Sequence, residues 1–260
     1  MSAHDPGAEL LIPADTPVHR LAPQCKVAAT VLFVLAVACT PRGVYWPYLW
    51  YLLLLAAVAT LAQLPPLTLL CRLVVEVPFL LFVLALPFAG SAPELTLWGV
   101  ELSEPGLHAA ATISLKATFG LLATGILAAT TALPEIIIGL ERLRVPRVFT
   151  AVAAFMVRYT EVVLAELARM RIARACRGGD PRWLWQVREV AGGLGALVVR
   201  TFERGERVYL AMASRGYAGS LPAALTGAAA SGGAWAAALT VPLLAAVGTV
   251  LAAVGTTVLA

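Results

Sequence analysis

The stretch VYWPYLWYLLLLAAVATLAQ, residues 44–63, is twenty residues long and contains no charged side chain. A helix of about 20 mostly apolar residues is long enough to cross the hydrocarbon core of a bilayer. A helix on the surface of a soluble domain keeps one polar face, and this stretch has none. It therefore predicts a transmembrane helix.

Four other stretches are similarly apolar, at about 25–40, 68–89, 107–131 and 233–259. Over the whole chain 60% of residues are hydrophobic and 13% are charged, whereas soluble domains have about 45–50% and about 25%. The apolar runs are continuous rather than alternating, which favours helices over a β-barrel. The sequence predicts an all-α polytopic membrane protein with about five transmembrane helices.

One region differs from these spans, because fourteen of the seventeen arginines lie between residues 133 and 216. Arginine and lysine collect on the cytoplasmic side of membrane proteins. We therefore expect a tail and four transmembrane helices in 1–132, a cytoplasmic region in 133–232 and a last transmembrane helix in 233–260. The membrane that these helices cross is expected to be the plasma (inner) membrane. Glutamates alternate with the arginines, so no nucleic-acid partner is expected. The first 24 residues do not resemble a signal peptide, so the first span should anchor the mature chain.

The arginine-rich region is predicted to contain three helices, at about 134–143, 147–177 and 185–215. Proline and glycine residues punctuate them, most clearly in the run Gly178-Gly179-Asp180-Pro181. The second and third helices end in similar triplets, Cys176-Arg177-Gly178 and Ser214-Arg215-Gly216. In both helices an apolar stripe leads to the arginine.

Several kinds of active site find no support in the sequence. There is no phosphate-binding loop, and the chain has only two lysines, Lys26 and Lys116. The three histidines do not have zinc-ligand spacing, and no nucleophile has a nearby base. We therefore expect no catalytic residue, no metal site and no cofactor. The four cysteines are interpreted as small packing residues.

Two ionisable residues, Glu76 and Lys116, lie well inside predicted spans. A charge at the centre of a bilayer costs about 2.5–3.5 kcal/mol on insertion scales, so each requires a partner. For Glu76 the simplest partner is Arg72, one turn earlier. For Lys116 we expect contact with another helix or with a partner subunit.

Three blocks of sequence resemble the transmembrane T components of energy-coupling factor transporters, the EcfT/CbiQ family. The first is Thr16-Pro17-Val18-His19-Arg20-Leu21-Ala22-Pro23-Gln24-Cys25-Lys26, where Ala22 and Gln24 depart from the family pattern. The second comprises residues 130–135 and 140–146, followed by Arg158-Tyr159, Glu166, Arg169-Met170 and Ala173-Arg174. The third and most specific block is 206–217.

The resemblance implies a non-catalytic subunit that couples two cytoplasmic ABC-type ATPases to a separate substrate-capture subunit in the bilayer. The family's pair of Ala-Arg-Gly-like triplets is similar to 176–178 and 214–216, with the alanine replaced in both. Residues 173–175, centred on Arg174, are a second choice for the first triplet. The implied ATPase-coupling residues are Cys176, Arg177, Gly178, Ser214, Arg215, Gly216 and Arg174.

The block at 206–212 is most similar to the cobalt-system branch, which implies a CbiM-like capture subunit with or without a small CbiN-like subunit. T components for nickel, biotin or another vitamin are alternatives, and a stand-alone permease or a lipid-modifying enzyme are weaker ones.

Overall fold

The computed structural model describes residues 11–12, 14–41, 43–83, 85, 94–97, 100–178, 187–217 and 230–259. The chain divides into two units by its contacts. One unit, called here the membrane unit, contains residues 9–139 and 228–260. The other, called the coupling unit after the role that the resemblance implies, contains the described residues from 140 to 217. The domain boundaries expected at 132/133 and 232/233 stay a prediction.

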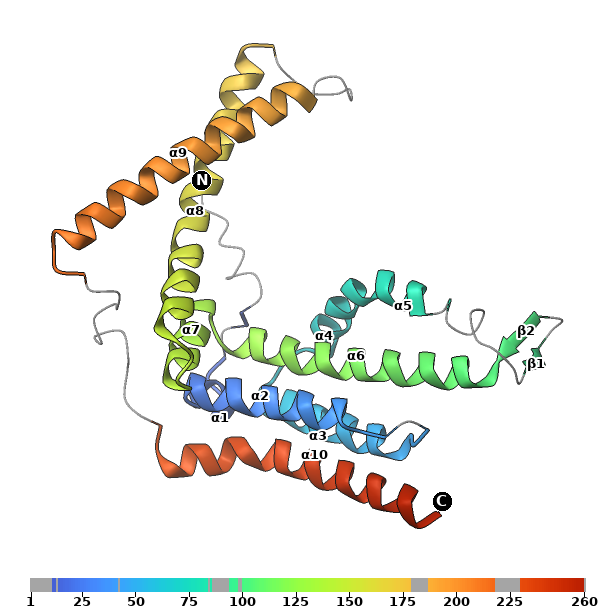
Figure 1. Ribbon diagram of the computed structural model, residues 1–260. Coiled ribbons are helices and arrows are strands. Elements are labelled where there is room, and N and C mark those ends of the chain that lie inside the picture. The colour runs from blue at the N-terminus through green and yellow to red at the C-terminus, as the bar shows by residue number, and fades with distance from the viewer. Residues whose placement is uncertain are drawn as a thin grey trace. The chain divides into compact units, whose positions relative to one another are not determined.

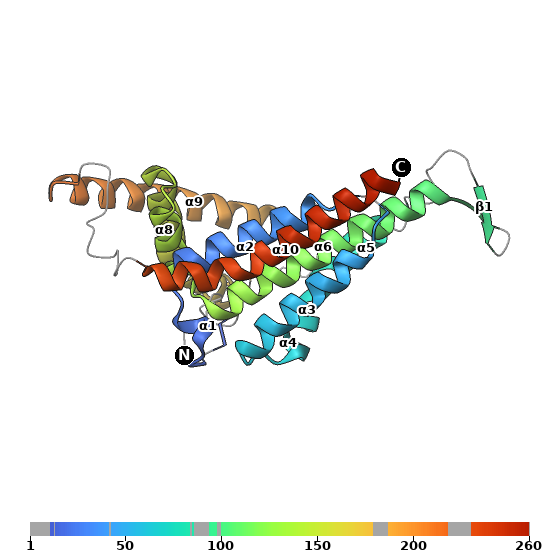
Figure 2. The same ribbon diagram turned by 90° about the horizontal axis from the view of Figure 1, so that it is seen from below.

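The membrane unit is built around helix α2 (Pro23–Ala38), which lies between α6 (Glu104–Thr130) and α10 (Gly232–Leu259). Helix α3 (Trp46–Leu61) contacts both α6 and α10, and the short α1 (Pro17–Arg20) lies on α3. Figures 1 and 2 show α2, α3, α6 and α10 running side by side. The prediction of an all-α polytopic membrane protein is confirmed.

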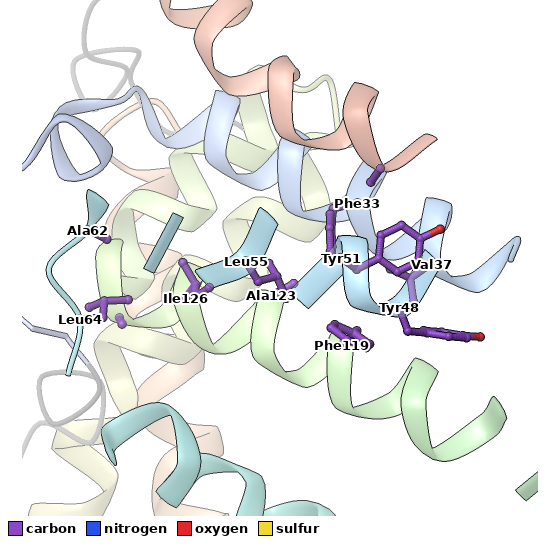
Figure 3. Close-up of a cluster of buried hydrophobic side chains, with 12 residues drawn as sticks. Phe33, Val37, Tyr48, Tyr51, Leu55, Ala62, Leu64, Phe119, Ala123 and Ile126 are labelled. Atoms are coloured by element: carbon purple, nitrogen blue, oxygen red, sulfur yellow. The ribbon is translucent and has the colours of Figure 1, made fainter. Parts of the chain in front are cut away.

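The core of the membrane unit contains an aromatic cluster (Figure 3). The Tyr51 ring is fully buried, and its centroid lies 5.9 Å from that of Phe33 and 6.1 Å from that of Phe119. Tyr48 stacks on Phe119 at 5.9 Å. Aromatic pairs at these separations add stabilisation beyond the area they bury, so the cluster joins α2, α3 and α6 into one packed body.

The expected spans are borne out unevenly. Three helical segments that overlap expected spans are long and apolar enough to cross a membrane: Pro66–Val83, Pro105–Thr130 and Gly232–Gly255. The first two expected spans form 16-residue helices, and at 1.5 Å per residue each is about 24 Å long. Proline and turn residues at positions 41 and 65 end these helices early.

The third expected span is interrupted. It contains α4 (Pro66–Leu73), a 3-10 turn η1 (Val74–Glu76) and α5 (Val77–Val83). Pro78 cannot donate a backbone hydrogen bond and its ring crowds the preceding turn, which accounts for the tighter 3-10 geometry there. Beyond α5, an antiparallel pair of short strands, β1 (Glu94–Leu97) and β2 (Val100–Ser103), occupies a loop for which the sequence predicted no strand.

The start of α6 carries a side-chain cap. Ser103 is the N-cap, and its side-chain oxygen accepts a hydrogen bond from the Gly106 amide at 3.4 Å. Pro105 occupies the first turn, where a missing amide hydrogen has no cost.

The three helices predicted in the arginine-rich region are confirmed as α7 (Leu133–Arg142), α8 (Arg147–Cys176) and α9 (Val187–Ala213). The residues before Val187 lie outside the described part of the chain. Helix α8 is also long and apolar enough to cross a membrane, although we expected this whole region to be cytoplasmic. Its apolar stretch precedes Glu166, and its basic residues concentrate in the second half, so the average over the region hid the apolar half.

Candidate functional site

The two Arg-Gly triplets have the same position in their helices. Helix α8 ends at Cys176, and Arg177 is its C-cap. Gly178 follows with φ of +79°, and its amide donates to the Ala175 carbonyl at 3.0 Å. In the same way Gly216 follows Arg215 with φ of +85° and donates to the Ala213 carbonyl at 3.0 Å.

The second triplet forms a complete Schellman motif, because the Tyr217 amide also donates to the Met212 carbonyl at 3.0 Å. Left-handed backbone at this position strongly favours glycine. A Cβ at Gly178 or Gly216 would meet no atom within 4 Å, so space is open at both positions. The glycines are therefore required by the chain reversal, and each places an arginine at the very tip of a helix.

Both tips are open to the surroundings. Cys176, Arg177 and Gly178 are exposed, as are Ser214, Arg215 and Gly216. Arg174, the centre of the competing triplet, is half-buried and lies in the last helical turn of α8, before its C-cap. The helix geometry thus favours Arg177 over Arg174 as the tip residue.

Helices α8 and α9 cross, and their C-terminal ends point away from each other (Figure 1). At the crossing, Glu166 of α8 accepts hydrogen bonds from Arg169 at 2.7 Å and from Arg200 of α9 at 2.9 Å. Glu203 and Arg207 of α9 form a looser ion pair at 4.0 Å. The crossing explains how one pair of helices presents two separated arginine tips.

The apolar stripes predicted along these helices are their less exposed faces. In α8 the half-buried positions include Val163, Leu167 and Met170. In α9 Leu197 is buried, and Val208 and Met212 are half-buried. Other large apolar side chains of both helices remain exposed: Val148, Phe149, Val152, Met156, Leu164, Ile172, Leu194, Val198, Val199, Phe202, Tyr209 and Leu210. Exposed apolar surface of this extent is typical of contact with a protein or a membrane.

The polar residues inside the membrane unit bind neighbouring helices. Lys116 of α6 donates to the carbonyls of Ala38 and Thr40, both at 2.8 Å, at the C-terminal end of α2. A helix C-terminus carries partial negative charge and unpaired carbonyls, so an ammonium group suits it. The contact is with another helix of the same chain.

Glu76 is buried, and it accepts a hydrogen bond at 3.0 Å from the Thr118 hydroxyl of α6. Arg72 donates to the Gly125 carbonyl, also in α6. Both side chains therefore attach the broken α4–η1–α5 segment to α6, while the pairing of Glu76 with Arg72 stays a prediction.

The amino-terminal motif forms a connected set of hydrogen bonds at the end of α6. Lys26 donates to the carbonyls of Thr130 at 2.9 Å and His19 at 3.0 Å. The His19 ring lies 2.7 Å from the Thr16 hydroxyl and 3.1 Å from the Ile12 carbonyl oxygen. The Ile12 amide in turn donates to the Ala129 carbonyl at 3.0 Å.

Sequence reasoning missed what Lys26 does. The two lysines of the chain form a reciprocal arrangement: each extends from one of the helices α2 and α6 to the carbonyl end of the other. Once these contacts are known, the two spacings agree, because fourteen residues separate Lys26 from Thr40 and Lys116 from Thr130. This spacing is what two antiparallel helices require.

Arg20, in the same motif, forms a two-pronged ion pair with Asp15 at 2.6 and 2.7 Å. The guanidinium holds the pKa of the Asp15 carboxyl below its ordinary value. Both side chains are largely exposed, so the pair orders the loop rather than contributing much stability.

The four cysteines are free thiols, and the metal-binding side chains of the described residues do not cluster. Within the described residues, no three His, Cys, Asp or Glu side chains gather as a metal site would require. The interpretation of the cysteines as packing residues holds for the buried Cys25, whereas Cys39, Cys71 and Cys176 are exposed.

The fold and the site together define a class: a helical, multi-pass membrane protein whose arginine-rich helices end in exposed tips. A profile of the cobalt transport protein family, CbiQ, matches residues 14–226. The chain is also 30% identical over 226 residues to an energy-coupling factor transporter transmembrane protein EcfT of Thermanaerovibrio acidaminovorans, covering 81% of this chain and 82% of the relative.

Two further relatives carry cobalt in their names. A cobalt transport protein CbiQ of Rhodobacter capsulatus is 30% identical over 136 residues, 51% of this chain and 54% of its own length. A putative fused cobalt transport protein CbiMQ of Methanocorpusculum labreanum is 26% identical over 121 residues, 46% of this chain and 20% of its own length. The chain belongs to the EcfT/CbiQ family of transmembrane T components of energy-coupling factor transporters.

Proposed function

We propose that this chain transmits the movements of two cytoplasmic ABC-type ATPases to a separate substrate-capture subunit in the plasma membrane, and that Arg177 and Arg215 are the residues that hold the ATPases. The observation that carries the proposal is the repeated helix end, an exposed arginine C-cap followed by a left-handed glycine.

The chemistry of the tips suits a grip. A guanidinium remains protonated and offers a planar set of donors, so it can bind a carboxylate or several carbonyls in a fixed orientation. Such a bond resists both pushing and pulling. The exposed Tyr209 and Leu210 near the end of α9 supply apolar contact beside the charge, as is usual at protein interfaces.

The apolar cavity inside the membrane unit offers few side chains that would hold a metal ion. It contains a cavity of about 300 Å³ among α1, α2, α3, α6 and α10, lined mostly by apolar side chains. The lining includes Lys26, a cation, and hydroxyls such as Thr30 and Thr130. Divalent cations prefer carboxylate, imidazole or thiolate ligands, so capture by another subunit fits this chain better.

Cobalt is the proposed substrate of the complex, and the capture subunit is proposed to be CbiM-like, with or without a CbiN-like subunit. The family description and two relatives are named for cobalt transport. The relative that covers most of the chain is named only for energy coupling, which keeps a module for nickel, biotin or another vitamin as the second candidate.

The test is reconstitution of the chain with its ATPases and capture subunit in liposomes, followed by ATP-driven uptake of Co²⁺. Changing Arg177→Ala and Arg215→Ala together should abolish uptake and release the ATPases. The matched control is Arg169→Ala with Arg207→Ala, since each lies eight residues before a tip on the same helix. Full uptake by the tip variant would refute the coupling role, and uptake of Ni²⁺ or biotin in place of Co²⁺ would refute the substrate.

A further inference from the structure

Helix α7 contains the point at which the chain passes from the membrane unit to the coupling unit, between Gly139 and Leu140. Any displacement of α8 must travel along this helix to reach the membrane helices by that route. The contacts of α7 beside this point therefore decide which membrane helices such a displacement reaches first.

Gly139 is buried against the beginning of α2. A Cβ placed there would lie 3.1 Å from the Gln24 amide nitrogen, 3.1 Å from the Pro23 carbonyl carbon and 3.2 Å from the Pro23 oxygen. These atoms are backbone atoms, so they cannot move aside as a flexible side chain would. The two helices meet here backbone to backbone, without a compressible side chain between them.

The beginning of α2 is itself fixed to α6. The Lys26 ammonium, 7% exposed, bonds to the Thr130 carbonyl at the end of α6 and to the His19 carbonyl. At the opposite end of α2, Lys116 of α6 bonds to the Ala38 and Thr40 carbonyls. A displacement of Pro23 and Gln24 must therefore carry α2 and α6 together.

We propose that the seat of Gly139 on Pro23–Gln24 is the junction through which movement of the coupling helices enters the membrane helices, and that Lys26 makes α2 and α6 respond as one lever. This proposal rests on the proposed function, and it names positioning residues that touch neither ATP nor the substrate.

The test uses the reconstituted complex and measures Co²⁺ uptake per ATP hydrolysed. Gly139→Val forces the two backbones apart, so we expect the ATPases to remain bound and active while uptake per ATP falls at least fivefold. The control is Gly205→Val in α9, where a Cβ would meet no atom within 4 Å; its ratio should match the unaltered complex.

A second variant keeps the test decisive if Gly139→Val fails to assemble. Lys26→Met keeps a long unbranched side chain and removes the ammonium, and it should lower uptake per ATP in the same way, with recovery in Lys26→Arg. An unchanged ratio in whichever of the two variants assembles would overturn the proposal. Loss of assembly in both would also overturn it, since it would show a role in folding only. Release of the ATPases by the double variant Arg177→Ala and Arg215→Ala is measured separately. Failure of the proposed coupling role is therefore distinguishable from failure of the proposed junction at Gly139.

Discussion

The two units of this protein use polar residues in opposite ways. Between the helices of the membrane unit, the two lysines bond to backbone carbonyls, and Lys26 is buried while Lys116 is half-buried. In the coupling unit the ion pairs are side chain to side chain, and their arginines are 61% exposed or more. Buried donors to helix ends hold a geometry firmly, whereas exposed ion pairs contribute little stability.

The difference fits a division of labour. In the membrane unit α2 and α6 are joined at two points by Lys26 and Lys116, as the proposed transmission of displacement would require. The coupling unit leaves apolar and arginine side chains available for partners. Each of the following predictions changes one side of this comparison.

The largest effect on stability is expected from Lys116→Met. The change removes this donor from the carbonyls of Ala38, which is exposed, and Thr40, which is buried. An unsatisfied polar group at a buried residue costs roughly 1–3 kcal/mol. The thermal unfolding midpoint of the detergent-purified chain should fall clearly. Lys116→Arg is the control and should recover part of the loss; a midpoint unaltered in Lys116→Met would contradict the role given to this contact.

A smaller loss is expected from Tyr51→Phe, which keeps the ring in the aromatic cluster. The Tyr51 hydroxyl lies 3.0 Å from the Thr40 hydroxyl and 2.9 Å from that of Thr249 in α10. Removing it should cost about 1 kcal/mol, measured by the same unfolding assay. A variant as stable as the unaltered chain would show that this network does not tie α10 to α2 and α3.

Gly178→Ala and Gly216→Ala should cost about 1 kcal/mol each through left-handed backbone strain, because no neighbouring atom would be touched. The loss is expected to be local: amide hydrogen exchange should quicken in the last turns of α8 and α9, and ATPase binding should weaken. Gly205→Ala in α9 is the matched control and should slightly slow amide hydrogen exchange in that helix. Unchanged exchange at both tips would contradict the C-cap assignment.

The smallest effect is expected from Glu166→Gln. It replaces the carboxylate shared by Arg169 and Arg200 with a neutral amide. Since both arginines are well exposed, the stability loss should be within about 1 kcal/mol. A much larger drop in the unfolding midpoint would mean that the crossing of α8 and α9 depends on this charge rather than on apolar packing.

Much of the fold could be predicted because it depends on local sequence. Apolar runs indicated the membrane helices, and proline and glycine marked the ends of α7, α8 and α9 to within a few residues. The 3-10 turn at 74–76 was not predicted, because Pro78 lies inside a continuous apolar run that reads as one helix.

The contacts between distant residues could not be predicted in the same way. The partners of Lys26 and Lys116 are backbone carbonyls, which every residue carries, so no residue type identifies them. Gly139 likewise gave no signal, since a glycine in a helix is informative only when its neighbour across the contact is known. The Arg-Gly tips were found because helix ends have a local code and because the pattern occurs twice.

The most direct test of the coupling role is a binding titration of the purified ATPase against the chain in nanodiscs. Losing a paired, charge-assisted contact costs about 2–5 kcal/mol, so Arg177→Ala and Arg215→Ala should each weaken binding by about 30-fold or more. The account predicts that result, with the Arg169→Ala and Arg207→Ala pair staying within about twofold, as expected for rim charges. Binding by both tip variants that is as tight as that of the control pair would contradict it.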